Sequence, residues 1–350
     1  MAQEQSIQPG GIETEVQQSG WRVRSPLYSW GIGVAAVMAI LAASLIVWGP
    51  EMDFPTTVST DTVGDVTLDR SLKDVTANTI DDSVDWITLK GAWLFDGISS
   101  AVTYALINIE AVLKWLPWPA VVAFLGLLSY GVGRWGLAAF TSLALLFVGF
   151  MGLWSNMIDT VALMVVAVVI AVAIGLPLGI LAARNRTADY ILRPILDGMQ
   201  TMPSFVYLLP GILFFGLGKP AGIFATIIYA VPPVIRLTNL GIRQVAAETV
   251  EASRAFGASP WQLLTTVQIP MALPTIMAGI NQTTMMALAM VTIASMVAAG
   301  GLGDDVLRAL QKNQSGNGAI AGLAIVFLAI IIDRLTQSVA ARRQDRLSVG

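Results

Sequence analysis

The 350-residue chain contains no histidine and no cysteine, and charged residues make up only 12% of it. It therefore has no histidine general base, cysteine nucleophile or disulfide, and no zinc or iron–sulfur site of the usual ligand types. Soluble domains carry roughly 25% charged residues, about twice this fraction. The net charge of −3 provides no broad basic face for nucleic acid. These shortages argue against a large soluble enzyme and against a nucleic-acid-binding protein.

Apolar residues, by contrast, make up 55% of the chain. A membrane-spanning helix takes about 20 apolar residues, and eight runs in the sequence approach that length. We therefore predict an all-α, polytopic bundle of membrane helices. The predicted spans cover 28–48, 117–133, 135–153, 158–183, 203–217, 221–240, 272–298 and 319–339. Because the run at 203–217 is short and only Arg134 divides the second run from the third, the count is seven or eight.

The distribution of basic residues predicts how the chain lies in the membrane. With the N-terminus in the cytoplasm, 13 of the 20 Lys and Arg residues fall on the cytoplasmic side and seven fall outside. Acidic residues divide the opposite way, with nine inside and 14 outside. This asymmetry agrees with the positive-inside rule. We therefore predict a multi-pass protein whose two termini are both cytoplasmic.

Two segments between the first and second spans have a different composition. Residues 50–90 carry nine acidic and three basic residues, which predicts a loosely ordered external segment. Apolar residues in 91–116 recur at helical spacing, which predicts an amphipathic helix at the outer membrane interface. That helix packs against the bundle or forms a regulatory surface. The predicted organisation is a tail (1–27), a transmembrane helix (28–49), the acidic segment (50–90), the interfacial helix (91–116), two transmembrane helices (117–153), a core domain (154–339) and a tail (340–350).

Transport across a membrane needs an energy source, and the sequence offers none of its own. A phosphate-binding P-loop needs a glycine five residues before its last glycine, and Ser or Thr after its lysine. The nearest string has Leu213 and Pro220 at these positions. Ionisable residues that would couple transport to an ion gradient lie only near the ends of the predicted spans. We therefore expect the energy to come from a partner protein.

The predicted cytoplasmic loop at 241–271 is the candidate contact for this partner. Good helix formers predict a short helix before Gly257, and a glycine suits the helix C-terminus because it accepts positive φ. Ser259 and Pro260 fit the N-cap and first position of a second helix, which Ile269–Pro270 is expected to end. The alternative is a plain helical connector.

The same loop resembles the EAA signature of ATP-binding-cassette (ABC) importer permeases. That signature reads Glu-Ala-Ala, three residues, Gly, nine residues, Ile, any residue and Leu-Pro; Ser253, Val267 and Ile269 depart from it conservatively. The resemblance implies the type I ABC importer transmembrane fold over the core domain. It also implies a coupling helix that sits in a groove of a separate ATPase, although Glu251 could instead cap its own helix. The implied coupling residues are Glu251, Ala252, Ser253, Gly257, Pro260, Ile269 and Pro270.

Segments at 200–207, 232–239, 277–283 and 299–303 resemble the glycine betaine/proline permeases. This resemblance implies an importer of a compatible solute such as glycine betaine or proline. Choline, carnitine and trimethylamine N-oxide are alternative solutes, and an ion-coupled secondary transporter is an alternative mechanism. The implied partners are a second permease copy, a cytoplasmic ATPase that holds ATP and Mg²⁺, and an extracytoplasmic binding protein, all at a prokaryotic plasma membrane. The chain itself is expected to bind no cofactor, metal or nucleic acid and to catalyse no hydrolysis.

A substrate pathway is the least defined feature. Four polar residues of the seventh predicted span share one helical face, and two aromatic residues begin the fifth. Aromatic faces bind quaternary ammonium groups, whereas hydrogen bonds between helices and ordinary packing would equally explain these residues. The candidates are Phe205, Tyr207, Asn281, Thr284, Thr292 and Ser295.

Overall fold

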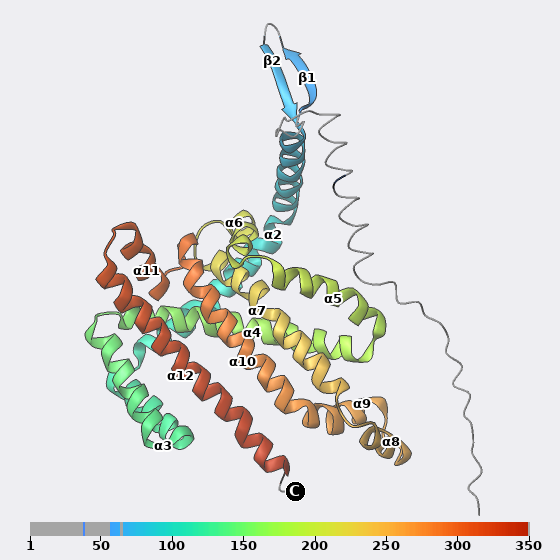
Figure 1. The fold of residues 1–350 in the computed structure, drawn as a ribbon, viewed down its shortest axis with the longest axis vertical. Helices are drawn as coiled ribbons and strands as arrows, with labels where there is room; N and C mark the ends of the chain where they lie inside the picture. Colours follow the sequence, from blue (N-terminus) through green and yellow to red (C-terminus); the bar gives the residue numbers. More distant parts are fainter. Residues whose placement is uncertain (1–37, 39–56, 64–65, 349–350) are drawn as a thin grey trace, which may run out of the picture. The chain divides into compact units, whose positions relative to one another are not determined.

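The computed structural model describes residue 38 and residues 57–63 and 66–348, with side chains described at 38 and 72–337 (Figure 1). Its contacts divide the chain into two compact units, 1–79 and 80–350. The predicted tail at 1–27 and nearly all of the predicted transmembrane helix at 28–49 lie outside the described residues.

The first unit contains a β-hairpin. Strands β1 (Thr57–Val63) and β2 (Val66–Ser71) pair antiparallel, with an irregularity in register near the start of β1. Thr and Val are frequent in both strands, and β-branched side chains favour extended backbone. The expectation of a loosely ordered segment at 50–90 is therefore wrong over 57–63 and 66–90, because β1, β2 and the start of helix α2 (Leu72–Trp115) occupy these residues. The prediction relied on the acidic composition of the segment and did not consider its many β-branched residues.

The second unit is helical. After α2 come α3 (Trp118–Phe150), α4 (Trp154–Arg184), α5 (Arg186–Thr201), α6 (Leu208–Phe215), α7 (Lys219–Arg243), α8 (Ala247–Ala255), α9 (Pro260–Gln262), α10 (Ile269–Ala294), α11 (Leu302–Gln311) and α12 (Ser315–Ser348). Two 3₁₀ turns, η1 (Ser204–Tyr207) and η3 (Ser295–Val297), precede α6 and follow α10. A π-helical segment, η2 (Leu263–Gln268), joins α9 to α10.

The predicted bundle of membrane helices is confirmed, and the β1–β2 hairpin is an addition to the all-α prediction. Among the described residues, six helices are long and apolar enough, by length and composition, to cross a membrane if α3 is counted as one helix. The number is seven if α5 and the η1–α6 segment, which are bent by 112°, form one broken span. Helix α2 is one of the six, so an interfacial position of 91–116 stays a prediction.

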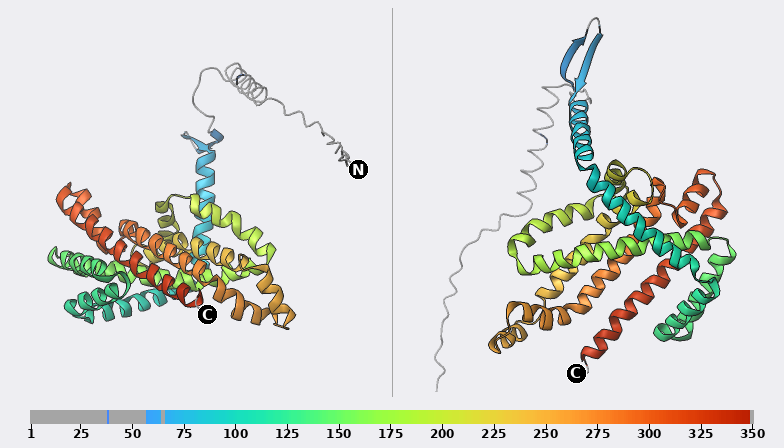
Figure 2. Two further views of the ribbon diagram at one scale, coloured as in Figure 1. Left: turned by 60° about the horizontal axis from the view of Figure 1, so that its bottom comes forward. Right: turned by 180° about the vertical axis from the view of Figure 1, so that it is seen from behind.

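Helix α3 is a helical hairpin. Its backbone leaves helical geometry at Gly133 and Arg134, where Arg134 has a φ of 59°. The hydroxyl oxygens of Ser129 and Thr141 lie 2.9 Å apart, whereas 12 residues of straight helix would separate them by about 18 Å. Figure 2 shows the two arms side by side. The two helices predicted within 117–153 are therefore observed, and each arm, at about 24 Å or less, is shorter than a hydrocarbon core of about 30 Å.

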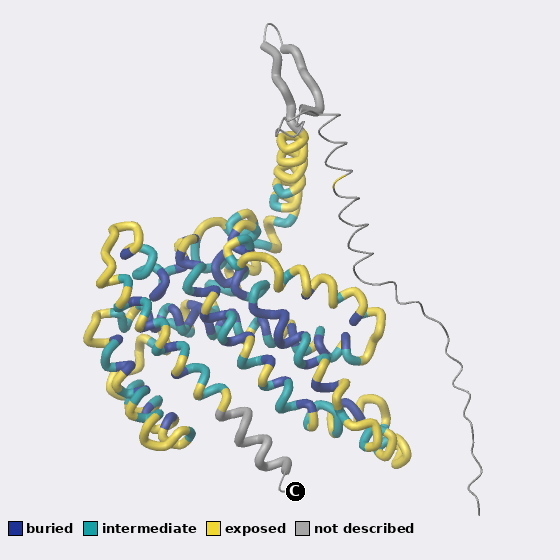
Figure 3. The backbone as a smooth tube through the Cα atoms, viewed as in Figure 1, coloured by how far each residue is buried: buried dark blue, intermediate teal, exposed yellow. Residues whose placement is uncertain are grey.

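The core of the second unit lies where α4, α7 and α10 pack together, and buried residues concentrate there (Figure 3). Small residues bring these backbones close. A Cβ atom added at Gly175 of α4 would lie 2.2 Å from Val234 Cγ1 of α7, and one added at Gly279 of α10 would lie 2.9 Å from Leu237 Cβ. The backbones of the three helices therefore approach one another so closely that there is no room for a side chain at these glycines.

Candidate functional site

The loop between α7 and α10 forms two short helices with a sharp turn. Helix α8 ends at Ala255, and Gly257 has a φ of 85°. The Ser259 hydroxyl accepts a hydrogen bond from the Gln262 amide, and the Gln262 side chain accepts one from the Ser259 amide. Pro260 occupies the first position of α9. These contacts confirm the predicted local roles of Gly257, Ser259 and Pro260.

The second helix does not end at Ile269–Pro270, and that prediction is wrong. The chain stays helical from α9 through η2 into α10, and Pro270 lies at the start of α10. A proline inside an α-helix clashes with the carbonyl four residues before it. Here the Ile269 amide donates to the Leu264 carbonyl five residues back, and this wider π spacing accommodates the proline. The loop is therefore continuous with a core helix.

The inner side of the loop is anchored in the bundle. Leu263 and Leu264 are buried, and Leu264 packs in one cluster with Ile242 of α7 and with Ala272 and Ile276 of α10. A cavity of about 760 Å³ lies between the loop and the ends of α4 and α7. Both ends of the loop are thus fixed to helices that form the core.

The outer side of the loop exposes two large aromatic side chains among polar residues. Phe256 and Trp261 flank the Gly257 turn, with 92% and 67% of their surfaces exposed. Glu251 and Ala252 are also exposed, whereas the Ser253 hydroxyl donates to a carbonyl of its own helix. Exposed aromatic residues on a polar loop are typical of a protein–protein interface. Phe256 and Trp261 occupy positions that the EAA signature does not specify, although two aromatic residues near the turn glycine are a visible signal in the sequence.

The pathway candidates in α10 and at the start of η3 have different hydrogen-bond partners. The Asn281 side chain donates to Asp333 of α12 at 3.2 Å, so it ties two helices together. The hydroxyls of Thr284, Thr292 and Ser295 each donate to a carbonyl in the preceding turn. Thr284 and Ser295 are buried, and Thr292 is partly exposed. A pathway role for these four residues stays a prediction.

The two aromatic candidates in η1 differ in their surroundings. Tyr207 is buried, its hydroxyl donates to the Met199 carbonyl of α5, and its ring lies 5.8 Å from that of Tyr229. Phe205 is 60% exposed. Tyr207 thus fixes η1 to α5 and α7, while Phe205 presents an aromatic face. A pathway role for either stays a prediction.

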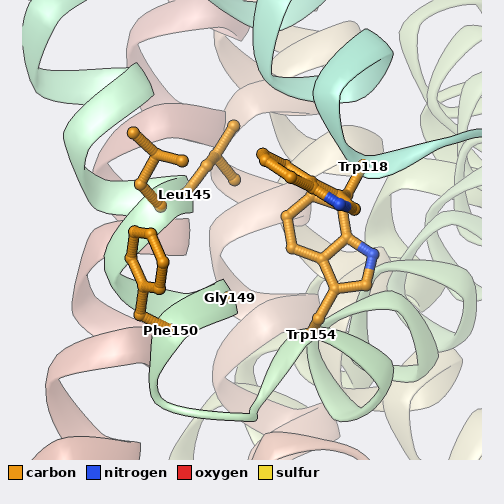
Figure 4. A pocket seen from close by; sticks show the side chains of 6 residues that line it. Trp118, Leu145, Gly149, Phe150 and Trp154 are labelled. Atoms are coloured by element: carbon orange, nitrogen blue, oxygen red, sulfur yellow. The ribbon is translucent and has the colours of Figure 1, made fainter.

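A separate apolar cavity of about 390 Å³ lies at the junction of α3 and α4 (Figure 4). Trp118, Leu145, Gly149, Phe150 and Trp154 line it. Tryptophan is enriched where hydrocarbon meets water in membrane proteins. The indole N–H groups are the only side-chain polar groups among these lining residues, so the cavity offers little to a hydrophilic solute. Nor does the described part of the chain gather three acidic side chains that could hold a metal ion.

Comparison with known proteins identifies close relatives of this chain. A family described as "Binding-protein-dependent transport system inner membrane component" matches residues 175–345. The glycine betaine/proline betaine transport system permease protein ProW of Escherichia coli K12 is 46% identical over 76% of this chain and 75% of its own length. The glycine betaine transport system permease protein OpuAB of Bacillus subtilis 168 is 43% identical over 80% and 99%. The glycine betaine/carnitine transport permease protein GbuB of Listeria monocytogenes 10403S is 44% identical over 75% and 94%.

A solved structure supports the architecture independently. The MetNI methionine ABC transporter in an inward-facing conformation matches with a TM-score of 0.50 and 22% identity, over 55% of this chain and 95% of the matched chain. At this identity the likeness concerns the fold alone. The helical part of this chain therefore shares the fold of the matched chain.

Proposed function

The chain belongs to the family of inner-membrane components of binding-protein-dependent transport systems, and we propose that it forms the membrane pathway of an ATP-driven importer of glycine betaine. ATP and Mg²⁺ bind to a separate ATPase subunit, which performs the hydrolysis. This chain forms the pathway and the surface that the ATPase binds and displaces.

The observation that carries this proposal is the loop between α7 and α10. Its outer side exposes Phe256 and Trp261, and its inner side is buried in the core through Leu264. The π-helical segment makes the loop continuous with α10. Because the loop is held in this way, an ATPase that displaces its outer side would also displace α7 and α10. Rigid-body switching requires such a connection. We infer that the ATPase binds here and that Glu251, Ala252, Ser253, Gly257, Pro260, Ile269 and Pro270 belong to the coupling segment.

The names of the relatives support the choice of solute. All three are named for glycine betaine, one also for proline betaine and one also for carnitine. Proline, choline and trimethylamine N-oxide are further candidates within the same chemistry of small amines. A competition assay that offers these solutes together ranks them.

The proposed assembly contains two copies of this chain, two ATPase subunits and an extracytoplasmic binding protein. The excess of Lys and Arg on one side of the predicted spans supports cytoplasmic termini in a prokaryotic inner membrane. This orientation puts the loop between α7 and α10 in the cytoplasm, where ATP is available.

Reconstituted uptake tests the proposal. The tagged chain, expressed with its genomic neighbours, is placed in liposomes with ATP on the ATPase side and the binding protein on the other. We expect accumulation of labelled glycine betaine only when both are present. Vesicles loaded with a non-hydrolysable ATP analogue are the control.

Two results would contradict the proposal at different levels. Uptake driven by an ion gradient without ATP would replace the ATP-driven mechanism with a secondary transporter. A bound, active ATPase without glycine betaine uptake would keep the mechanism and reject the solute.

A further inference from the structure

A buried carboxylate lies where α7 ends and the loop begins. Asp189, in the first turn of α5, is only 7% exposed. Arg193 contacts its two oxygens at 3.2 and 2.8 Å, Asn239 of α7 donates to it at 2.8 Å, and Arg243 of α7 lies 3.1 Å away. We call these four residues the Asp189 cluster. A buried charge needs such a set of partners to offset its lost hydration.

Arg243 extends the Asp189 cluster to a third helix. Its guanidinium donates to the Ala182 carbonyl near the end of α4 at 2.7 Å and to the Asn239 side chain at 2.8 Å. The last carbonyls of a helix have no partner within the helix, so this bond satisfies one of them. The planar guanidinium holds several acceptors in fixed directions. The Asp189 cluster therefore joins the ends of α4 and α7 to the start of α5.

The Asp189 cluster also stands next to the coupling segment in the chain. Arg243 is the last residue of α7, and α8 begins at Ala247 after a short connector. The chain therefore connects α8 to Arg243 through only three residues. On the other side, α5 leads through a bend of 112° into the η1–α6 segment. The Asp189 cluster is thus the polar link between the loop and this bent pair.

A second ion pair between α5 and α7 provides an internal comparison. Arg236 contacts Asp197 at 2.5 Å, and their side chains are 38% and 67% exposed. Exposed pairs contribute little because water competes for both charges. Asp197 has the same charge and lies on the same helix as Asp189, but it is exposed and makes one described ion pair. Asp189 is buried and has two arginines, whose side chains are 67% and 36% exposed, and Asn239 as partners.

We propose that Asp189 is a positioning residue that makes α5 follow the end of α7 when the loop is displaced. The proposal rests on the proposed function, because that function supplies the displacement. In this proposal Asp189 acts through its neighbours and not through direct contact with the ATPase or the solute. Its effect passes through Arg243 and Asn239.

The first experiment measures uptake per ATP hydrolysed in the reconstituted complex. We expect Asp189→Asn to lower this ratio at least tenfold while ATP hydrolysis stays within twofold of the parent. Asp197→Asn, the matched control, should leave the ratio within twofold. Equal ratios for both variants and the parent would overturn the proposal.

The second experiment measures positions directly and does not depend on the solute. Because the chain has no native cysteine, Ile195→Cys on α5 and Glu248→Cys on α8 provide two spin-label sites per copy, and an excess of unlabelled chain restricts the measured distances to one copy. Both residues are exposed. We expect a narrow distribution of label distances in the parent and in Asp197→Asn, and a broad one in Asp189→Asn. A distribution that stays narrow in Asp189→Asn would overturn the proposal even if the transported solute is not glycine betaine.

A milder variant serves if Asp189→Asn does not fold. Arg243→Lys keeps the charge but loses the fork that reaches Asp189 and the Ala182 carbonyl together. We expect it to lower the uptake ratio at least threefold and to broaden the label distances. A folded Arg243→Lys protein with the parent's ratio and distances would contradict the role of the Asp189 cluster.

Discussion

Two regions of the molecule differ in how closely they are packed. The faces between α4, α7 and α10 are tightly packed, whereas the loop that joins α7 to α10 is exposed. In the packed faces, Gly175 and Gly279 bring backbones so close that a single added carbon would collide with a neighbour. In the loop, a carbon added at Gly257 would meet nothing within 4 Å, and Phe256 is 92% exposed. The first region completes its contacts within the chain. The second exposes apolar side chains that another protein would cover.

Because of this difference, substitutions in the two regions should affect different properties, namely the stability of the permease and its coupling to the ATPase. Substitutions in the packed faces should lower the stability of the permease itself, because cores tolerate little added volume. Substitutions on the outer side of the loop should leave the permease folded and weaken its link to the ATPase. Four predictions test this separation.

Gly175→Leu should have the largest effect. The new side chain collides with Val234, where even a Cβ would approach within 2.2 Å, and overpacking of this kind costs about 3 kcal/mol or more. The yield of monodisperse protein and its unfolding temperature in detergent measure the loss. Gly322→Leu on α12, where an added Cβ meets nothing within 4 Å, is the control. Equal losses in both variants would refute the close-packing account.

Phe256→Ala and Trp261→Ala should each weaken ATPase binding. Buried aromatic anchors of an interface contribute about 2 kcal/mol or more, which corresponds to roughly 30-fold in affinity. The unfolding temperature of the isolated permease should not change. Tyr190→Ala, which removes an aromatic residue that is 81% exposed on α5, should bind the ATPase normally. An unchanged affinity in both loop variants would show that the ATPase contacts another surface.

Gly257→Val should weaken coupling because it changes the backbone conformation of the turn, and not because the new side chain collides with a neighbour. The φ of 85° costs an L-residue about 1–2 kcal/mol, and the surrounding space is open, so the turn changes shape without a clash. We expect a protein that inserts at normal abundance and transports about tenfold less glycine betaine per bound ATPase. Gly198→Val, at a helical position that is also open, should transport normally. Normal uptake by Gly257→Val would remove Gly257 from the coupling segment.

Ser259→Ala should have the smallest effect. It removes half of the reciprocal Ser259–Gln262 cap, at about 1 kcal/mol. Hydrogen exchange in α9 should accelerate about fivefold, with uptake reduced by less than that. Thr265→Ala, which loses only a bond to its own helix, should exchange as the parent does. Identical exchange in the two variants would mean that the cap does not hold the turn.

Local chemistry explains which parts of the loop could be predicted. The positive φ of Gly257 and the cap at Ser259 follow from a few neighbouring residues, and sequence analysis found both. The π-helical segment did not follow, because burial of Leu263 and Leu264 against the core keeps the chain helical where Pro270 alone indicates an end. Packing therefore overrode the local signal.

The charged and polar links between helices required the folded chain. Asn239 lies 50 residues from Asp189, and Asp333 lies 52 residues from Asn281. Helical spacing placed Asn281 on a polar face but could not supply its partner. No motif marked Asp189. Its i,i+4 partner Arg193 lies on the same helix, but Asn239 and Arg243 reach it only when α5 packs beside α7.

A site-specific cross-link tests the central claim most directly. In the cysteine-free chain, Phe256→Cys carries one thiol, to which a photo-activated cross-linker is attached before the ATPase is added. The account predicts a cross-link to the ATPase from this position and none from Tyr190→Cys. A stable complex that cross-links from Tyr190→Cys but not from Phe256→Cys would contradict it.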